Sequence, residues 1–356
     1  MHKNKICIIS PSLKMGGIER ALTVLAGYFL KQGYTVYFIS AQGGEKFYEL
    51  DKEIRFFEPS VIRQKGLVGK IKFYFNVVSF IKKTVNKINP DVVLSFGDAF
   101  NPLVLLALKN SKIPVFISDR TSPDFKFNPI INFGKKYLYP NSAGFIAQTK
   151  KAADYKVKHF GNKLSIKIIP NAIKEIKPID CIREKWIVSV ARLSKEKGVE
   201  RLLESFSLIE NRENWKLVFA GNGPLLDVMK EKVVELQIQN EVLFLGQVKD
   251  IDSLLAQSAI FVLPSYIEGF PNALCEALSA GLPSICFESI PYENIIDDGV
   301  NGFVIKNNDI NDLAIKINYL MKNESKRNEL SENAKRLNNK YSLDNIGKMY
   351  LDFILK

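Results

Sequence analysis

Short apolar runs alternate with segments of helical periodicity along the whole chain, and this alternation restricts the possible folds more than any other feature. In the first half the runs are Ile6–Ser10, Thr35–Ser40, Ile54–Phe57, Asp91–Ser95, Pro114–Ser118, Gly144–Gln148 and Ile166–Ile169. In the second half they are Trp186–Ala191, Trp215–Ala220, Glu241–Leu245, Ile260–Leu263, Ser284–Phe287 and Gly302–Ile305. Buried strands that alternate with helices form parallel sheets. The sequence therefore predicts an α/β fold of Rossmann-like, doubly wound parallel sheets.

A polar stretch interrupted by proline, Lys174–Lys185, separates the two series of runs. The chain has 356 residues, 46% of them hydrophobic, which exceeds one typical domain and allows two cores. We therefore expect one domain at residues 1–172, a second at 173–340, and a C-terminal helical segment at 341–356.

One segment of the second half, Pro264–Pro283, has helix punctuation at both ends. Pro271 stands where a first helical residue would be, and Gly281 with Pro283 forms a stop signal. The turn before this helix would present backbone N–H groups and the positive end of the helix dipole, which suits a phosphate. Proline has no N–H. The expected donors are Gly269, Phe270, Asn272, Ala273 and Leu274.

Two carboxylates, Glu268 and Glu276, bracket this turn with seven residues between them. A carboxylate accepts hydrogen bonds from a vicinal diol, the group that ribose and hexoses present. Phosphate donors between two diol acceptors indicate a sugar nucleotide. The alternative is that both are solvated surface residues.

Two further loops contain residues suited to a diphosphate. Arg192 and Lys197 follow the strand that starts at Trp186, and cations there suit a diphosphate and its leaving-group charge. Gly16 and Gly17 open a helix after the first strand, where glycine allows close backbone approach and positive φ. The alternatives are a solvated charged loop and a plain tight turn.

The segment EGFPNALCEALSAGLP closely resembles the Glu-x7-Glu signature of retaining glycosyltransferases of family four, which have the GT-B fold. The resemblance implies two Rossmann-like domains that face a cleft, the first binding acceptor and the second binding nucleotide sugar, with the C-terminal helix packed back on the first. It also implies that Glu276 holds the donor ribose and that Glu268 lies beside the transferred sugar.

Other loops acquire roles from the same resemblance. It implies that the backbone at Gly16 and Gly17 approaches the donor diphosphate and the acceptor, and that Arg192 and Lys197 stabilise the departing diphosphate. In relatives the loop that corresponds to GQVKD contacts the nucleobase, so the resemblance also implies a base contact for Val248.

The loop ISDRTSP departs from the family pattern. Related enzymes often have a histidine here that touches the donor sugar, whereas this chain has Asp119 and Arg120. The planar fork of an arginine suits an anionic acceptor group or a diphosphate. The alternative is a structural ion pair between the two residues.

The expected reaction transfers a hexose or N-acetylhexosamine, with retention, from a nucleotide diphosphate sugar, UDP-sugar being favoured, to a lipid-linked or oligosaccharide acceptor of bacterial surface glycans. No cofactor, metal or nucleic acid is expected. Asp250-x-Asp252 reads best as a helix cap, although metal-dependent transferases use that spacing. The alternatives are a sugar-nucleotide epimerase, an NAD oxidoreductase, and a non-catalytic binder of nucleic acid or other anionic polymers.

Charge is unevenly distributed. Residues 1–178 contain 29 Lys and Arg against 12 Asp and Glu, a net charge of +17, while the remainder contains 21 against 26, a net charge of −5. We expect the first domain to dock on an anionic membrane through two basic zones. One is Lys65, Lys70, Lys72, Lys82, Lys83 and Lys87, and the other is Lys135, Lys136, Lys150, Lys151, Lys156, Lys158 and Lys163.

The first zone lies in a helical pattern over Leu67–Ile88. Its expected apolar stripe is Leu67, Ile71, Tyr74, Val78, Ile81, Val85 and Ile88, widened by Phe73, Val77 and Phe80. The stripe either packs against the sheet or faces a membrane. No run approaches the length of a membrane span, and the four cysteines lack paired spacing. We expect a cytoplasmic protein, peripheral on the inner face of the cytoplasmic membrane.

Overall fold

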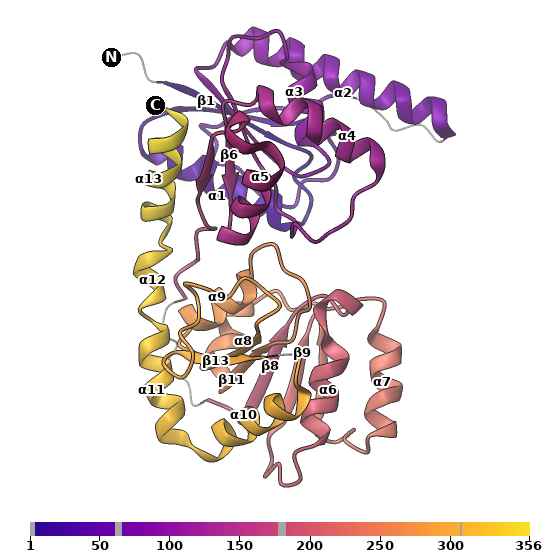
Figure 1. Cartoon of the computed structure of the whole chain (residues 1–356), viewed down its shortest axis with the longest axis vertical. Coiled ribbons are helices and arrows are strands. Elements are labelled where there is room, and N and C mark those ends of the chain that lie inside the picture. The colour runs from indigo at the N-terminus through magenta and orange to yellow at the C-terminus, as the bar shows by residue number, and fades with distance from the viewer. Residues whose placement is uncertain (1–3, 61–65, 177–182, 307) are drawn as a thin grey trace. The chain divides into compact units, whose positions relative to one another are not determined.

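The computed structural model describes residues 4–60, 66–176, 183–306 and 308–356 and divides the chain into two compact units (Figure 1). Unit 1 comprises Met1–Ala172 and Leu343–Lys356, and unit 2 comprises Ile173–Ser342. Each unit is built on its own parallel sheet with flanking helices, so the predicted fold class is confirmed. The chain passes from unit 2 back to unit 1 between Ser342 and Leu343, whereas the expected boundary lay between residues 340 and 341.

Unit 1 contains a seven-stranded sheet in the order β3-β2-β1-β4-β5-β6-β7. Its strands are β1 (Lys5–Ser10), β2 (Thr35–Ser40), β3 (Arg55–Phe57), β4 (Val92–Phe96), β5 (Val115–Ser118), β6 (Gly144–Ala147) and β7 (Ile166–Ile168). Its helices are α1 (Gly17–Lys31), α2 (Gly66–Ile88), α3 (Asn101–Ala107), α4 (Pro129–Leu138), α5 (Lys150–Phe160) and α13 (Leu343–Ile354). The strand order reverses between β1 and β4, and ligands of doubly wound sheets bind at such a reversal.

Unit 2 contains a six-stranded sheet in the order β10-β9-β8-β11-β12-β13. Its strands are β8 (Trp186–Val190), β9 (Lys216–Ala220), β10 (Val242–Gly246), β11 (Ile260–Leu263), β12 (Ser284–Phe287) and β13 (Gly302–Ile305). Its helices are α6 (Val199–Ser207), α7 (Leu226–Glu235), α8 (Ile251–Gln257), α9 (Asn272–Ser279), α10 (Ile310–Lys322), α11 (Glu324–Ala334) and α12 (Leu337–Lys340). The order reverses between β8 and β11, which pair in parallel.

The C-terminal helix α13 packs on α1 within unit 1. The Tyr28 hydroxyl donates to the Asp344 carbonyl at 3.3 Å. A Cβ at Gly347 would lie 2.3 Å from the Tyr28 ring, so only glycine permits this approach. The chain therefore returns to unit 1 after completing unit 2.

The predicted apolar stripe of α2 does not pack against the sheet over the first half of the helix, so that alternative is wrong there. Its buried line runs through Phe73, Val77, Ile81 and Val85, at the i, i+4 spacing of one helix face. Leu67 is 75% exposed and Ile71 is 63% exposed, and both were expected in the stripe. The first half of α2 is apolar on two faces, and only the packing of the unit shows which one is buried.

Three of the four cysteines, Cys7, Cys275 and Cys286, are buried and unpaired, and Cys181 lies outside the described residues. Burial raises the pKa of all three thiols, which keeps them protonated and unreactive. Within the described ranges, no helix is both long and apolar enough to cross a membrane.

Candidate active site

The loops that follow β8 and β11 meet because these two strands are neighbours at the reversal of the unit 2 sheet. The Tyr266 N–H donates to the Glu196 carbonyl at 2.9 Å, which ties one loop to the other. Gly198 has a φ of 61°, and a Cβ there would lie 2.0 Å from the Pro264 carbonyl oxygen. The close approach of the two loops therefore requires glycine at this position.

This approach brings together two of the residues predicted from sequence, Lys197 and Glu268. Lys197 Nζ lies 2.6 Å from Glu268 Oε1, and their side chains are 26% and 11% exposed. The Ser265 hydroxyl donates to the same Oε1 at 2.7 Å. No hydrogen bond to Oε2 is found in the part of the chain that the structure describes. Glu268 is thus held in place through one oxygen, with the other available to accept a sugar hydroxyl.

A residue that the sequence analysis missed, Arg201, holds the backbone that leads into this turn. Its guanidinium is buried in α6, donates to the carbonyls of Pro264 at 2.6 Å and Ser265 at 2.7 Å, and lies over the Phe287 ring. Burial lowers the pKa of Arg201 to about 10, which leaves it charged at neutral pH. Its signal in the sequence is an arginine on the otherwise apolar face of Val199, Leu202, Leu203 and Phe206.

The predicted turn lies directly before α9, with one difference from expectation. The helix begins at Asn272, and Pro271 occupies the capping position. The Asn272 N–H donates to the Phe270 carbonyl at 2.9 Å, so it is already used in the structure described. Glu276 is half-buried one turn into α9, and Ala273 lies in the first turn. The Phe270 ring is buried and packs edge-on against Tyr341.

Two other predicted residues of unit 2, Arg192 and Val248, lie in loops near the same sheet edge. Arg192 follows β8 and its side chain is exposed, whereas Val248 follows β10 and is half-buried. The glycine loop after β9 packs against the Arg192 loop: the Leu193 N–H donates to the Asn222 carbonyl at 3.1 Å. This loop gives Arg192 a defined backbone position.

In unit 1, Gly16 caps α1 and Gly17 is its first residue. The Gly16 carbonyl accepts a hydrogen bond from the Tyr48 hydroxyl at 3.1 Å. The expected positive φ is not found: Gly16 has a φ of −175°, which any residue adopts. The loop lies at the reversal of the unit 1 sheet, at the carboxyl end of β1.

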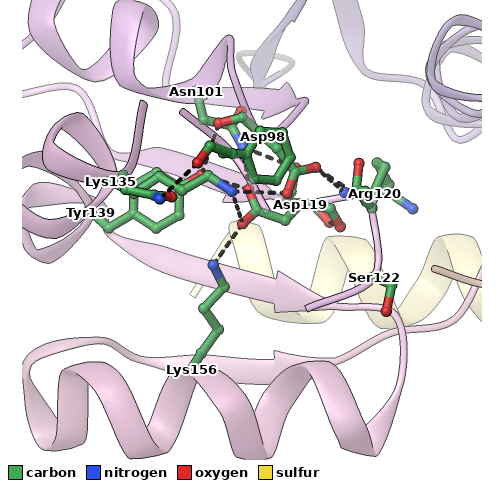
Figure 2. Close-up of polar contacts among 12 residues, drawn as sticks. Asp98, Asn101, Asp119, Arg120, Ser122, Lys135, Tyr139 and Lys156 are labelled. Atoms are coloured by element: carbon green, nitrogen blue, oxygen red, sulfur yellow. Dashed lines mark hydrogen bonds and ion pairs between the residues drawn. The ribbon is translucent and has the colours of Figure 1, made fainter. Parts of the chain in front are cut away.

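The loop after β5, where Asp119 and Arg120 lie, is held by a buried charge cluster (Figure 2). Lys156 Nζ lies 2.6 Å from Asp119 Oδ2, and Lys135 Nζ lies 3.1 Å from the same oxygen. Lys135 also contacts Asp98 Oδ1 at 2.9 Å. Asp98 Oδ2 accepts the Arg120 N–H at 2.9 Å and the Thr121 N–H at 3.1 Å. The cluster therefore fixes the backbone of the loop.

The cluster shifts the pKa values of its members in opposite directions. Burial alone would raise the pKa of Asp119, but Lys156 and Lys135 lower it to about 2. Burial and the neighbouring Asp119 raise the pKa of Asp98. Burial lowers the pKa of Lys135, but the two carboxylates outweigh this effect and the net shift is upward. The Tyr139 hydroxyl donates to Asp119 at 2.5 Å, and burial raises the pKa of Tyr139 well above its ordinary value of 10.

Arg120 does not pair with Asp119, so the expected alternative of an ion pair between them is wrong. Its guanidinium donates to Asn171 at 2.6 Å and to the Tyr350 hydroxyl at 2.8 Å, and lies 3.4 Å from the centroid of the Phe96 ring. Within the described residues, its Nε is buried without a hydrogen-bond partner. Burial lowers the pKa of Arg120. The guanidinium is thus half-buried, and its two hydrogen bonds and its ring contact are all made to neutral groups.

Asp250 caps α8, as predicted: its carboxylate accepts the Ser253 N–H at 3.1 Å and the Ser253 hydroxyl at 2.7 Å. Asp252 pairs instead with Lys174. The two carboxylates therefore have separate structural partners. The residues that the structure describes contain no group of three or more side chains placed to hold a metal ion.

Comparison with known proteins assigns these two units to a family of enzymes. The family described as "Glycosyltransferase Family 4" matches residues 15–175, and the family described as "Glycosyl transferases group 1" matches residues 174–337. Together the two matches cover residues 15–337, which include every strand of both sheets except β1. The chain is a glycosyltransferase with the GT-B fold.

This glycosyltransferase has relatives along its full length. A Campylobacter jejuni protein named "GalNAc-alpha-(1->4)-GalNAc-alpha-(1->3)-diNAcBac-PP-undecaprenol alpha-1,4-N-acetyl-D-galactosaminyltransferase" is 28% identical over 360 residues, 98% of each chain. The crystal structure of a glycosyltransferase from Rickettsia africae superposes with a TM-score of 0.82 at 20% identity, covering 99% of this chain and 98% of the other. HepE of Anabaena in complex with UDP superposes at 0.81 with 17% identity, covering 98% of each.

Proposed function

We propose that this glycosyltransferase moves a hexose or N-acetylhexosamine from a UDP-sugar to an acceptor with retention at the anomeric carbon. The observation that carries the proposal is the Lys197–Glu268 pair, which stands beside the turn before α9 at the reversal of the unit 2 sheet. A cation, a carboxylate and the backbone N–H groups of a helix terminus at one sheet edge suit a sugar diphosphate.

The donor would bind along this edge. Glu276 would accept the ribose hydroxyls, and the backbone of Val248 would contact the base. Glu268 would orient the transferred sugar through the oxygen that Lys197 leaves available. In unit 2 the diphosphate would be held by Arg192 and by the backbone of the turn Gly269, Phe270, Pro271, Asn272, Ala273 and Leu274. For unit 1, the donor contact of Gly16 and Gly17 stays a prediction from the sequence.

Lys197 has a particular place in this mechanism. Glu268 neutralises its charge, while two further hydrogens of the ammonium group can be donated to a diphosphate. Charge on the diphosphate grows as the sugar leaves, so Lys197 and Arg192 would favour the transition state over the ground state. We infer a front-face reaction in which the departing diphosphate takes the acceptor proton, so that the enzyme needs neither a base of its own nor a metal.

We propose that the acceptor is a lipid-linked or oligosaccharide intermediate of bacterial surface glycans. The name of the Campylobacter jejuni relative, which specifies an undecaprenol diphosphate substrate, supports this class. Arg120 and Asp119 lie at the carboxyl end of β5 in unit 1, and the positive charge of Arg120 would attract an anionic acceptor group. Asp119, in contrast, has its carboxylate occupied by two lysines and a tyrosine.

We also propose a peripheral contact with an anionic membrane at the cytoplasmic face. The expected second basic zone is smaller than its sequence indicates, because Lys135 and Lys156 are buried against Asp98 and Asp119. Lys65 of the first zone lies outside the described residues. Five lysines of each zone are exposed, but in the second zone Lys150 and Lys151 pair with Asp154 and Asp124.

Thermal-shift measurements with UDP, GDP, ADP and NAD test the donor proposal, because a ligand stabilises the native state in proportion to the logarithm of its concentration over Kd. UDP should give the largest rise in Tm. A larger rise with NAD would refute the proposal. NMR of the product from a UDP-sugar should show the anomeric configuration of the donor, and release of UDP without acceptor would favour an epimerase.

A further inference from the structure

The first half of α2 presents apolar side chains that the fold of unit 1 does not use. Leu67, Val68, Ile71 and Phe75 are 75%, 79%, 63% and 72% exposed. We call these four residues the α2 apolar surface. The same helix buries a separate line of side chains, Phe73 among them, in the core of the unit. Contiguous apolar exposure of this kind marks an interaction surface.

A groove continues from this surface between α2 and α3, two helices that lie side by side in unit 1 (Figure 1). Its volume is about 510 Å³. Phe75, Val78 and Leu106 supply apolar walls, and Lys82 and Lys109 supply cations. No aspartate or glutamate is among the residues that line the groove. Phe75 belongs to both features, so the apolar surface leads directly into the basic groove.

The charge of α2 narrows the class of partner. The helix carries Lys70, Lys72, Lys82, Lys83 and Lys87 and no carboxylate over its whole length. An apolar surface on a helix whose charged residues are all basic complements an amphiphile with an anionic head, which is the chemistry of a bilayer that contains acidic phospholipids. A protein partner with the same pattern would need an acidic rim around an apolar centre.

We propose that the α2 apolar surface inserts into the membrane interface and that the α2–α3 groove binds the phosphate headgroup of an anionic phospholipid. Lys82 and Lys109 would contact the phosphate from the two sides of the groove, and Phe75 and Leu106 would lie against the upper acyl chains. This inference rests on the membrane contact of the proposed function but not on its donor chemistry. It assigns that contact to one helix face and one lipid class.

Sedimentation with vesicles tests the proposal with the full chain. Vesicles of phosphatidylcholine and phosphatidylglycerol in equal parts are compared with pure phosphatidylcholine. The pair Lys82→Glu and Lys109→Glu should lower binding to the anionic vesicles by at least about tenfold, because each basic side chain near such a leaflet contributes substantially to binding. The matched pair Lys158→Glu and Lys163→Glu makes the same charge change on α5 and the turn after it, in the same unit, and should cost far less.

The apolar part of the proposal has its own matched pair. Phe75→Ser should lower vesicle binding several-fold even at high salt, which screens the lysines but not the apolar contact. Phe133→Ser on α4, where the phenylalanine is 65% exposed, should leave binding unchanged. Far-UV circular dichroism of every variant checks that each is folded. Calorimetry of UDP binding is a separate measurement, so a failure of this inference is distinguished from a failure of the donor proposal.

Several results would overturn the inference. Equal binding to neutral and anionic vesicles would show that the protein does not recognise an anionic headgroup. Equal losses in the two charge-reversal pairs would indicate diffuse attraction rather than a groove, and a larger loss for Phe133→Ser would place the contact on α4. Inorganic phosphate or glycerol phosphate at millimolar concentration could protect the groove while the protein does not bind vesicles. That result would show that the groove binds a soluble ligand and not a membrane.

Discussion

Replacing Lys156 by methionine should destabilise unit 1, because it removes a cation from the buried cluster around Asp119. Lys156 Nζ lies 2.6 Å from Asp119 Oδ2, and both side chains are under a tenth exposed. Lowering the pKa of Asp119 from 3.8 to about 2 corresponds to roughly 2–3 kcal/mol of stability at neutral pH. Removing one partner of a buried pair also leaves the other uncompensated, and typical losses are about 3–5 kcal/mol. We expect a loss in this range at pH 7.

The sign of the pH dependence follows from the same contacts. In the native protein the pKa of Asp119 is depressed, so its contribution is complete above pH 3.8 and is lost as the pH falls through about 2. Without Lys156, burial is the largest influence left and the pKa rises. A folded state that takes up a proton gains stability as the pH falls. The deficit of Lys156→Met should therefore shrink between pH 7 and pH 5.

Urea unfolding, followed by far-UV circular dichroism, measures the loss. Both tryptophans, Trp186 and Trp215, lie in unit 2, so their fluorescence should report a transition that the variant leaves unchanged. Lys150→Met, on the same helix but in an exposed i, i+4 pair, is the matched control and should change stability by less than about 0.5 kcal/mol. A loss below about 1 kcal/mol for Lys156→Met, or a deficit independent of pH, would refute the reasoning.

Four further outcomes are expected. Glu276→Ala should weaken UDP binding by about 1.5–3 kcal/mol in calorimetry, the scale of hydrogen bonds to charged groups, and unchanged affinity would remove its ribose role. Arg192→Ala and Lys197→Ala should lower kcat more than they raise the donor KM in steady-state kinetics; a change in KM alone would assign ground-state binding. Arg201→Met should destabilise unit 2 by about 2–4 kcal/mol in urea, since it leaves buried carbonyls without donors, and tryptophan fluorescence will show whether it does. Turnover should survive EDTA, and loss that Mg²⁺ restores would contradict a metal-free reaction.

Local patterns in the sequence were sufficient to predict the sheets and part of the candidate site. A buried parallel strand is an uninterrupted apolar run, and this is a local property, so runs such as Ile260–Leu263 coincide with strands of the structure. The turn between Glu268 and α9 follows from proline and glycine, whose backbone preferences do not depend on distant residues. Lys197 and Glu268 could be placed at the ends of their strands, but their contact depends on the pairing of β8 with β11.

Tertiary structure alone decided the fate of charged and apolar side chains whose partners are distant in sequence. Lys135 and Lys156 look like surface lysines in the sequence, yet both are buried because the fold places a carboxylate against each. Lys135 contacts Asp98 and Lys156 contacts Asp119, and in each pair the partners are 37 positions apart in the sequence. Arg201 looks like an ordinary helix residue in the sequence, and only the fold shows that it donates to the Pro264 carbonyl. The sequence by itself determined that the first half of α2 is apolar and basic. Which of its two apolar faces is buried depends on the neighbouring helices and strands, because helical periodicity ranks the faces only by composition.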